Sequence, residues 1–131
     1  MTTIEEMIAW RKKHVFDKLD EIARAKGADY SGKTGDTFKN IRLIEVLSDG
    51  VITTDVGLVT RMTDKFSRMV QLLTREFLVY LGQKFGVAIN ADGPAVKDES
   101  VEDSIRDYIN YLTYELVIRA ERWNGGKLPL D

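Results

Sequence analysis

Several residue types that build common functional sites are missing or rare in this sequence. There is no cysteine and only one histidine, His14. This composition excludes disulfides and cysteine nucleophiles, and it removes the usual ligands of a zinc site. A bound metal would have to be a hard ion held by carboxylates, such as Mg²⁺. Proline is also rare: Pro94 and Pro129 are the only two.

Neither charge sign dominates, and no apolar run is long. The chain carries 19 basic and 21 acidic residues, for a net charge of −2. This balance argues against general electrostatic binding to DNA, although it leaves a local basic pocket open. We find no signal-peptide pattern and no apolar stretch long enough to cross a bilayer. We therefore expect a soluble cytoplasmic protein without a membrane partner.

Apolar residues recur at spacings of three and four over most of the chain, which is typical of amphipathic helices. The predicted helices cover residues 3–26, 36–47, 54–85 and 100–123. Thr3 with Glu6 forms a capping box, and Ser100 with Asp103 forms a second N-terminal cap. The prediction is an all-α bundle of about four helices. We expect residues 1–131 to form one domain, with residues 1–3 and 124–131 frayed.

The stretch GADYSGKT, residues 27–34, matches the phosphate-binding P-loop pattern residue for residue. A P-loop follows a strand and opens a helix. Here a predicted helix precedes the stretch, and Gly35 with Asp36 follows it. We therefore interpret it as a glycine-rich connection between helices. Its polar side chains are still candidates for ligand binding, because functional residues often lie on loops held by a rigid scaffold. These candidates are Asp29, Tyr30, Lys33 and Asn40.

One face of the predicted helix 54–85 is strongly basic. At helical pitch Arg61, Lys65 and Arg68 fall on one side, with Asp64 beside them and Arg75 further along. A solvated surface would explain such a face, but Leu72 lies in the middle of it and indicates partial cover. Cations on adjacent turns with one acid between them suit a phosphate-bearing ligand.

The predicted helix 100–123 carries acids and tyrosines on one side. Asp103 and Asp107 are spaced i, i+4, and Tyr111 continues the same side. Capping explains Asp103 but not Asp107, which lies one turn further in. Carboxylates beside partly covered aromatic rings need a cation or a metal. We therefore predict that this helix faces the basic one across a polar pocket closed by the 27–40 loop, with Arg61 or Lys65 in reach of Asp103 or Asp107.

Three blocks in order resemble the nucleotide modification associated domain, type 1, a family common in tailed phages. The blocks are KGADYSGKTGDTFKN, GLVTRMTDKFSRMVQLL and VKDESVEDSIRDYINYL. The resemblance covers about residues 24 to 118, and the segment between Thr74 and Val96 is longer than in the family pattern. The matched positions are Asp29, Tyr30, Phe38, Asn40, Arg61, Asp64, Lys65, Arg68, Lys97, Asp98, Glu99, Ser100, Asp103, Asp107 and Tyr111.

The resemblance implies a protein that handles nucleotides in the cytoplasm of a phage-infected cell. It adds Lys97 to the candidates for ligand binding and Glu99 to Asp64, Asp103 and Asp107 as candidates for a metal. A more distant likeness is to the MazG-like all-α nucleoside triphosphate pyrophosphohydrolases. Glu99 and Glu102 form one E-x-x-E of that family, but the later E-x-x-D is missing.

Two functions follow from these residues. One is a Mg²⁺-dependent enzyme that hydrolyses a nucleotide, with the carboxylates holding the metal and Arg61, Lys65 and Arg68 holding phosphates. The other is a protein that binds a nucleotide without chemistry and sequesters it, for example a signalling nucleotide in counter-defence. A third, purely structural role is assembly. Trp10 lies opposite the apolar stripe of the first helix and suggests a homo-oligomer.

Overall fold

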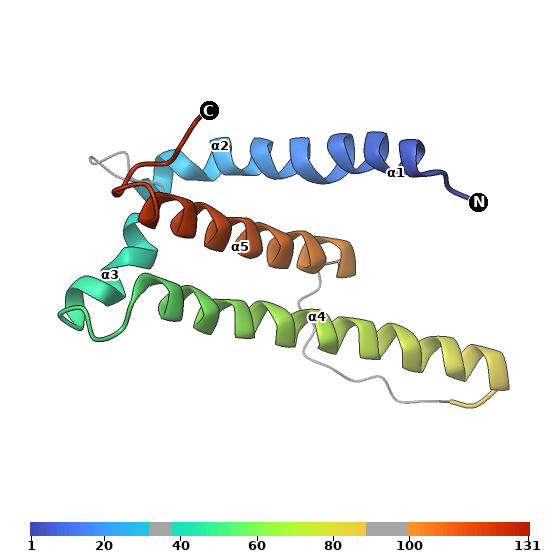
Figure 1. Cartoon of the computed structure of the whole chain (residues 1–131). Coiled ribbons are helices and arrows are strands. Elements are labelled where there is room, and N and C mark those ends of the chain that lie inside the picture. Colours follow the sequence, from blue (N-terminus) through green and yellow to red (C-terminus); the bar gives the residue numbers. More distant parts are fainter. Residues whose placement is uncertain (32–37, 89–99) are drawn as a thin grey trace. The chain divides into compact units, whose positions relative to one another are not determined.

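The computed structural model describes residues 1–31, 38–88 and 100–131, with the backbone alone for residues 27–31. This part of the chain is built from helices and turns, which confirms the all-α prediction (Figure 1). The first helix is continuous and consists of α1 (Ile4–Arg11), a π-helical segment η1 (Lys12–Phe16) and α2 (Asp17–Ser31). The others are α3 (Lys39–Leu47), α4 (Thr54–Phe85) and α5 (Val101–Arg122).

The chain forms two compact units, Met1–Leu58 and Val59–Asp131. Helix α4 begins in the first unit and continues into the second. The organisation of residues 1–131 as one domain stays a prediction. None of the helices in the described ranges combines the length and the apolar character that a bilayer span requires.

The first helix begins as the sequence predicts and ends later. Thr3 and Glu6 form the capping box, in which the Thr3 N–H donates to the Glu6 carboxylate at 2.8 Å and the Glu6 N–H donates to the Thr3 hydroxyl at 3.1 Å. The predicted end at Lys26 is wrong, because α2 continues to Ser31. Gly27 in a helix costs only about 1 kcal/mol relative to alanine, and no proline forces a stop. Much of the P-loop-like stretch is therefore helical.

Helix α3 ends in a turn that the Ser48-Asp49-Gly50 sequence predicts. The N–H of Asp49 donates to the Val46 carbonyl at 3.2 Å, and the N–H of Gly50 donates to the Glu45 carbonyl at 2.8 Å. Asp49 has the left-handed φ of 53° that this type of helix end requires. The chain then turns directly into α4.

The Glu45 side chain links α3 to the start of α4. Its carboxylate accepts hydrogen bonds from the N–H of Thr54 at 2.9 Å and from the Thr54 hydroxyl. The two helices also approach closely at Gly57, where a Cβ atom would lie 2.6 Å from Cγ2 of Ile44. Glu45 therefore satisfies backbone and side-chain donors at the beginning of the longest helix.

In the second unit, α4 and α5 run antiparallel to each other (Figure 1). The rings of Phe66 and Tyr108 pack between them, with 5.7 Å between centroids. The Ser100 hydroxyl accepts a hydrogen bond from the Asp103 N–H at 3.0 Å, which confirms the predicted cap of α5. Beyond α5, the Gly126 N–H donates to the Glu121 carbonyl at 2.8 Å. The first residues of the C-terminal segment thus form a turn, where the sequence analysis expected fraying.

Candidate functional site

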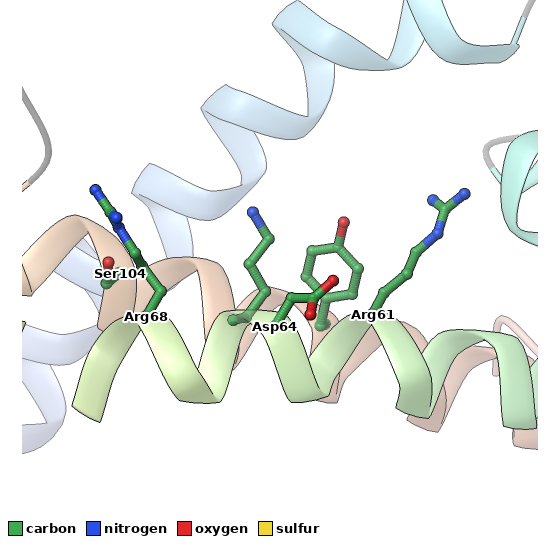
Figure 2. A pocket seen from close by; sticks show the side chains of 6 residues that line it. Arg61, Asp64, Arg68 and Ser104 are labelled. Atoms are coloured by element: carbon green, nitrogen blue, oxygen red, sulfur yellow. The ribbon is translucent and has the colours of Figure 1, made fainter. Parts of the chain in front are cut away.

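A cleft of about 450 Å³ lies between α4 and α5 in the second unit (Figure 2). Helix α4 supplies most of its lining side chains, and α5 supplies the others. Nearly all of them are candidates that the sequence analysis named. The lining residues are Arg61, Asp64, Lys65, Arg68, Ser104 and Tyr111.

The α4 wall of the cleft is basic because helical pitch brings its cations to one side. Figure 2 shows Arg61 and Arg68 projecting from the same side of the helix, with Asp64 between them. These two arginines are seven residues apart, which is two turns or about 10 Å along the axis. Lys65 lies one turn from each and lines the same cleft. The wall therefore presents three cations in a row, with one carboxylate among them.

Lys65 is held by two groups from α5. Its Nζ lies 3.3 Å from Oδ2 of Asp107 and 5.7 Å from the centre of the Tyr111 ring. This ion pair confirms the predicted contact between the basic and acidic helices. The two side chains are 36% and 45% exposed, and pairs this exposed contribute about 0–1 kcal/mol to stability. The main effect of the contact is therefore to orient Lys65 in the cleft.

The α5 wall of the cleft is aromatic and polar. The Tyr111 ring lies against the Tyr114 ring, with 5.6 Å between centroids and an angle of 55°. The Asn110 amide donates a hydrogen bond to the Tyr114 hydroxyl at 2.9 Å. These contacts restrict Tyr111, which offers the cleft a ring face and a hydroxyl.

Ser104 is a lining residue that the sequence analysis missed. It is only 2% exposed, and it lies near Arg68 at one end of the cleft (Figure 2). The position could have been found from its spacing, three residues after the apolar Val101 and four before Tyr108. A serine on the apolar side of a helix is small enough to let a neighbouring helix approach.

Glu115 is a second residue that the sequence analysis missed. It lies one turn beyond Tyr111 on α5, and its Oε2 is buried with no hydrogen-bond partner within the described ranges. Burial raises the pKa of the Glu115 carboxyl, and the positive charge of Arg119 partly opposes this rise. Its i, i+4 spacing from Tyr111 could have placed it on the same side of the helix.

Several predicted residues are not part of the described cleft. Asp103 is exposed and pairs with Arg106 on its own helix at 3.5 Å. Asn40 is an exposed residue of α3 in the first unit. Asp29 and Tyr30 belong to the end of α2, and their side chains lie outside the described part of the structure. The remaining candidates, Lys33, Lys97 and Glu99, also lie outside the described residues, as do residues 32–37 of the 27–40 loop and residues 89–98 before α5.

The described carboxylates do not form a metal site. Among the described residues, no group of three or more acidic or histidine side chains gathers around one point. Asp107 is paired with Lys65 and Asp103 with Arg106. The predicted metal set also includes Glu99, which is outside the described ranges. The described residues alone therefore do not fit Mg²⁺, and its binding stays a prediction.

A second hollow, of about 440 Å³, lies in the first unit. It is formed where α3 ends and α4 begins, and four of its six lining residues are polar. Its lining residues are Arg42, Glu45, Val46, Asp49, Gly50 and Thr54. Glu45, Asp49, Gly50 and Thr54 already take part in the helix ends described above. The hollow therefore follows from the way the chain turns between two helices.

Comparisons of the chain with protein-family models, with curated proteins and with solved structures gave no match. The site is therefore defined by its own geometry, a basic wall on α4 facing an aromatic and acidic wall on α5. The resemblance to the nucleotide modification associated domain stays a prediction.

Proposed function

We propose that this protein binds a phosphorylated nucleotide in the cleft between α4 and α5. The observation that carries the proposal is that Arg61, Lys65 and Arg68 line one cleft of about 450 Å³. Asp64 and Asp107 bring two negative charges, so three cations against two carboxylates leave a net charge of +1. Arginine and lysine make charge-assisted hydrogen bonds to phosphate, which are the strongest of the common polar contacts.

The dimensions of the cleft support a ligand with more than one phosphate. The three cations extend over two helical turns, about 10 Å, so that neighbouring phosphates can each meet a different side chain. The ring of Tyr111 gives the opposite wall a surface on which a base can stack. The volume falls in the range usual for small-molecule sites, about 300–1,000 Å³.

Binding without chemistry is the function that the contacts favour. Asp107, the carboxylate most suited to a metal by its position, is engaged with Lys65 at 3.3 Å. Together with the resemblance to a family common in tailed phages, this supports a protein that sequesters a nucleotide, such as a signalling nucleotide in counter-defence. Hydrolysis with Mg²⁺ is the second candidate. It is favoured by the i, i+4 spacing of Asp103 and Asp107, and it requires Glu99 or another ligand to complete the site.

Calorimetric titration with nucleoside triphosphates tests the binding site. Arg68→Ala should lower the affinity about ten- to a hundred-fold, since a lost charge-assisted contact costs about 1.5–3 kcal/mol. Arg75→Ala is the matched control, because Arg75 lies one heptad further along the same face of α4 and does not line the cleft. Its affinity should stay within about twofold of the wild type. Equal affinities of Arg68→Ala and the wild type would remove α4 from the site.

The same titration with Asp107→Asn separates the two candidate functions. Asparagine keeps the shape of the side chain and loses the charge that a metal needs. If the protein only binds, Asp107→Asn and EDTA should each change the affinity by a few-fold at most, and no product should form. If it hydrolyses the nucleotide, both should abolish turnover. Asp103→Asn is a poorer variant, because Asp103 also belongs to the capped first turn of α5.

A cytoplasmic location and a homo-oligomeric state complete this proposal. Trp10 supports an oligomer, because its side chain is exposed on α1. Among the ring pairs of the described residues, it stacks only against His14, with 4.9 Å between ring centroids. Exposed tryptophans are enriched at protein interfaces. The molar mass in solution, from light scattering, tests the oligomeric state.

A further inference from the structure

Helix α4 carries an exposed apolar stripe in the second unit. Its members are spaced by four, three, four and three residues, which is the heptad spacing of a coiled-coil seam. Each is between 42% and 57% exposed, although together they fall within about 80° of arc. We define the stripe as Phe66, Val70, Leu73, Phe77 and Tyr80. Phe66 lies at the edge nearest α5 and also contacts the Tyr108 ring.

The stripe lies on the side of α4 away from the arginines of the cleft. Arg68 and Arg75 each follow a member of the stripe by two residues, which corresponds to a rotation of about 200°. Lys65, which contacts α5, lies between the two sides. A molecule that covers the stripe would therefore leave the arginine side of the helix accessible.

The positions beside the stripe are almost free of charge. Heterotypic coiled coils select their partners by complementary charges at these flanking positions. On α4 the flanking residues between Phe66 and Lys84 include one acid and no base, and they are Ser67, Met69, Thr74, Glu76, Leu81 and Gln83. With a single charge among the flanking positions, the apolar stripe meets little charge repulsion from a second copy of itself.

We propose that a second copy of the chain packs on this stripe, antiparallel, about a two-fold axis next to Leu73. A two-fold interface uses the same patch on both subunits, and Leu73 is the midpoint of the stripe. Lys84 continues the stripe seven residues after Phe77. A parallel pair would bring the two Lys84 ammonium groups together at the seam, whereas an antiparallel pair places them at opposite ends.

The area of the stripe is large enough for this interface. The three aromatic members have roughly 200 Å² of side-chain surface each, and about half of it is exposed. With the two aliphatic members, the stripe offers roughly 400–500 Å² per copy. A stable interface buries about 800 Å² per partner, so the stripe supplies more than half of it. The largest apolar patch on a typical monomer is about 300–600 Å² and is often functional, so the stripe has the size of such a patch.

Light scattering coupled to size exclusion tests the proposal. The wild type at micromolar concentration should have twice the chain mass of 14.9 kDa, and Leu73→Glu should have the chain mass. Leu47→Glu is the matched control, because Leu47 on α3 is 74% exposed and lies outside the stripe. It should remain a dimer. A wild-type mass of 14.9 kDa would overturn the proposal. In that case the stripe would be covered by a different protein or by residues 1–58 of the same chain.

Single cysteines test the orientation, since the sequence has no cysteine of its own and each introduced thiol is the only one in the chain. Under mild oxidation, Leu73→Cys should give a covalent dimer and Lys84→Cys should not. A covalent dimer of Lys84→Cys would overturn the antiparallel arrangement, and the absence of one for Leu73→Cys would overturn the axis. These outcomes are independent of nucleotide binding, so either proposal can fail alone.

Discussion

Two hollows in the described part of the chain are nearly equal in volume and differ in what their polar groups do. In the hollow of about 440 Å³ between α3 and α4, Glu45 accepts hydrogen bonds from Thr54, and Asp49 takes the left-handed turn that ends a helix. In the cleft of about 450 Å³ between α4 and α5, side chains of two helices meet, and the contact of Lys65 with Asp107 is partly exposed. The density of polar residues is therefore a weak guide to a binding site. A better guide is whether those residues are already required by the backbone.

Charge reversal should separate the two hollows most strongly. Arg61→Glu in the cleft should lower nucleotide affinity about a hundred-fold or more, because it removes a charge-assisted contact and adds a repelling charge. Arg42→Glu in the other hollow should leave the affinity within about twofold. Isothermal titration calorimetry measures both. Similar losses for the two variants would mean that the hollows do not differ in function.

Removing the Glu45 carboxylate, which caps α4, should lower the stability of the fold and leave nucleotide binding unchanged. Glu45→Ala leaves two donors of Thr54 without their acceptor, so we expect the free energy of unfolding to fall by about 1–2 kcal/mol. Glu45→Gln keeps an acceptor oxygen and should lose less. Urea denaturation gives these values, and nucleotide affinity measured on the folded variants should match the wild type. A loss of affinity in Glu45→Ala with unchanged stability would contradict the structural role.

The ion pair of the cleft should contribute little to stability. In a double-mutant cycle of Lys65→Met and Asp107→Asn, we expect a coupling free energy below about 1 kcal/mol, because both groups are partly solvated. The same variants should change nucleotide binding more than unfolding, with Lys65→Met causing the larger loss. A coupling of several kcal/mol would show that the pair holds α4 to α5.

Glu45 and Glu115 form a final contrast. The Glu45 carboxylate accepts a hydrogen bond from Thr54, whereas Oε2 of Glu115 is buried and has no hydrogen-bond donor among the described residues. Burial raises the pKa of Glu115 in the folded chain. The folded state therefore favours the protonated acid, and ionisation opposes folding as the pH rises above the ordinary glutamate value. Glu115→Gln should raise the melting temperature at pH 7 by a small amount. The difference should vanish at about pH 3.5, where both side chains are neutral. Thermal unfolding at the two pH values checks this.

Features that depend on local chemistry or on helical period could be predicted from the sequence. The caps at Thr3 and Ser100 are local, and the contact of Lys65 with Asp107 followed from placing opposite charges on facing sides of two helices. The later end of α2 could not be predicted, because a single glycine is too weak a signal to fix a helix end. Ser104 and Glu115 were missed because their importance comes from burial, which depends on how the helices pack.

The π-helical segment Lys12–Phe16 determines where the first helix can lose a residue. A π turn accommodates one residue more than an α turn. Deletion of one residue within this segment can therefore be absorbed by a return to ordinary α geometry, without breaking the helix on either side. Because the extra residue of the π turn is the one removed, residues 4–11 would keep nearly the same rotation relative to α2, whereas a deletion in an α-helical part would turn them by about 100°. Trp10 would keep its side of the first helix and the residues of the second unit would be unchanged, so this segment is the place where the first helix can be shortened by one residue without redirecting its exposed side.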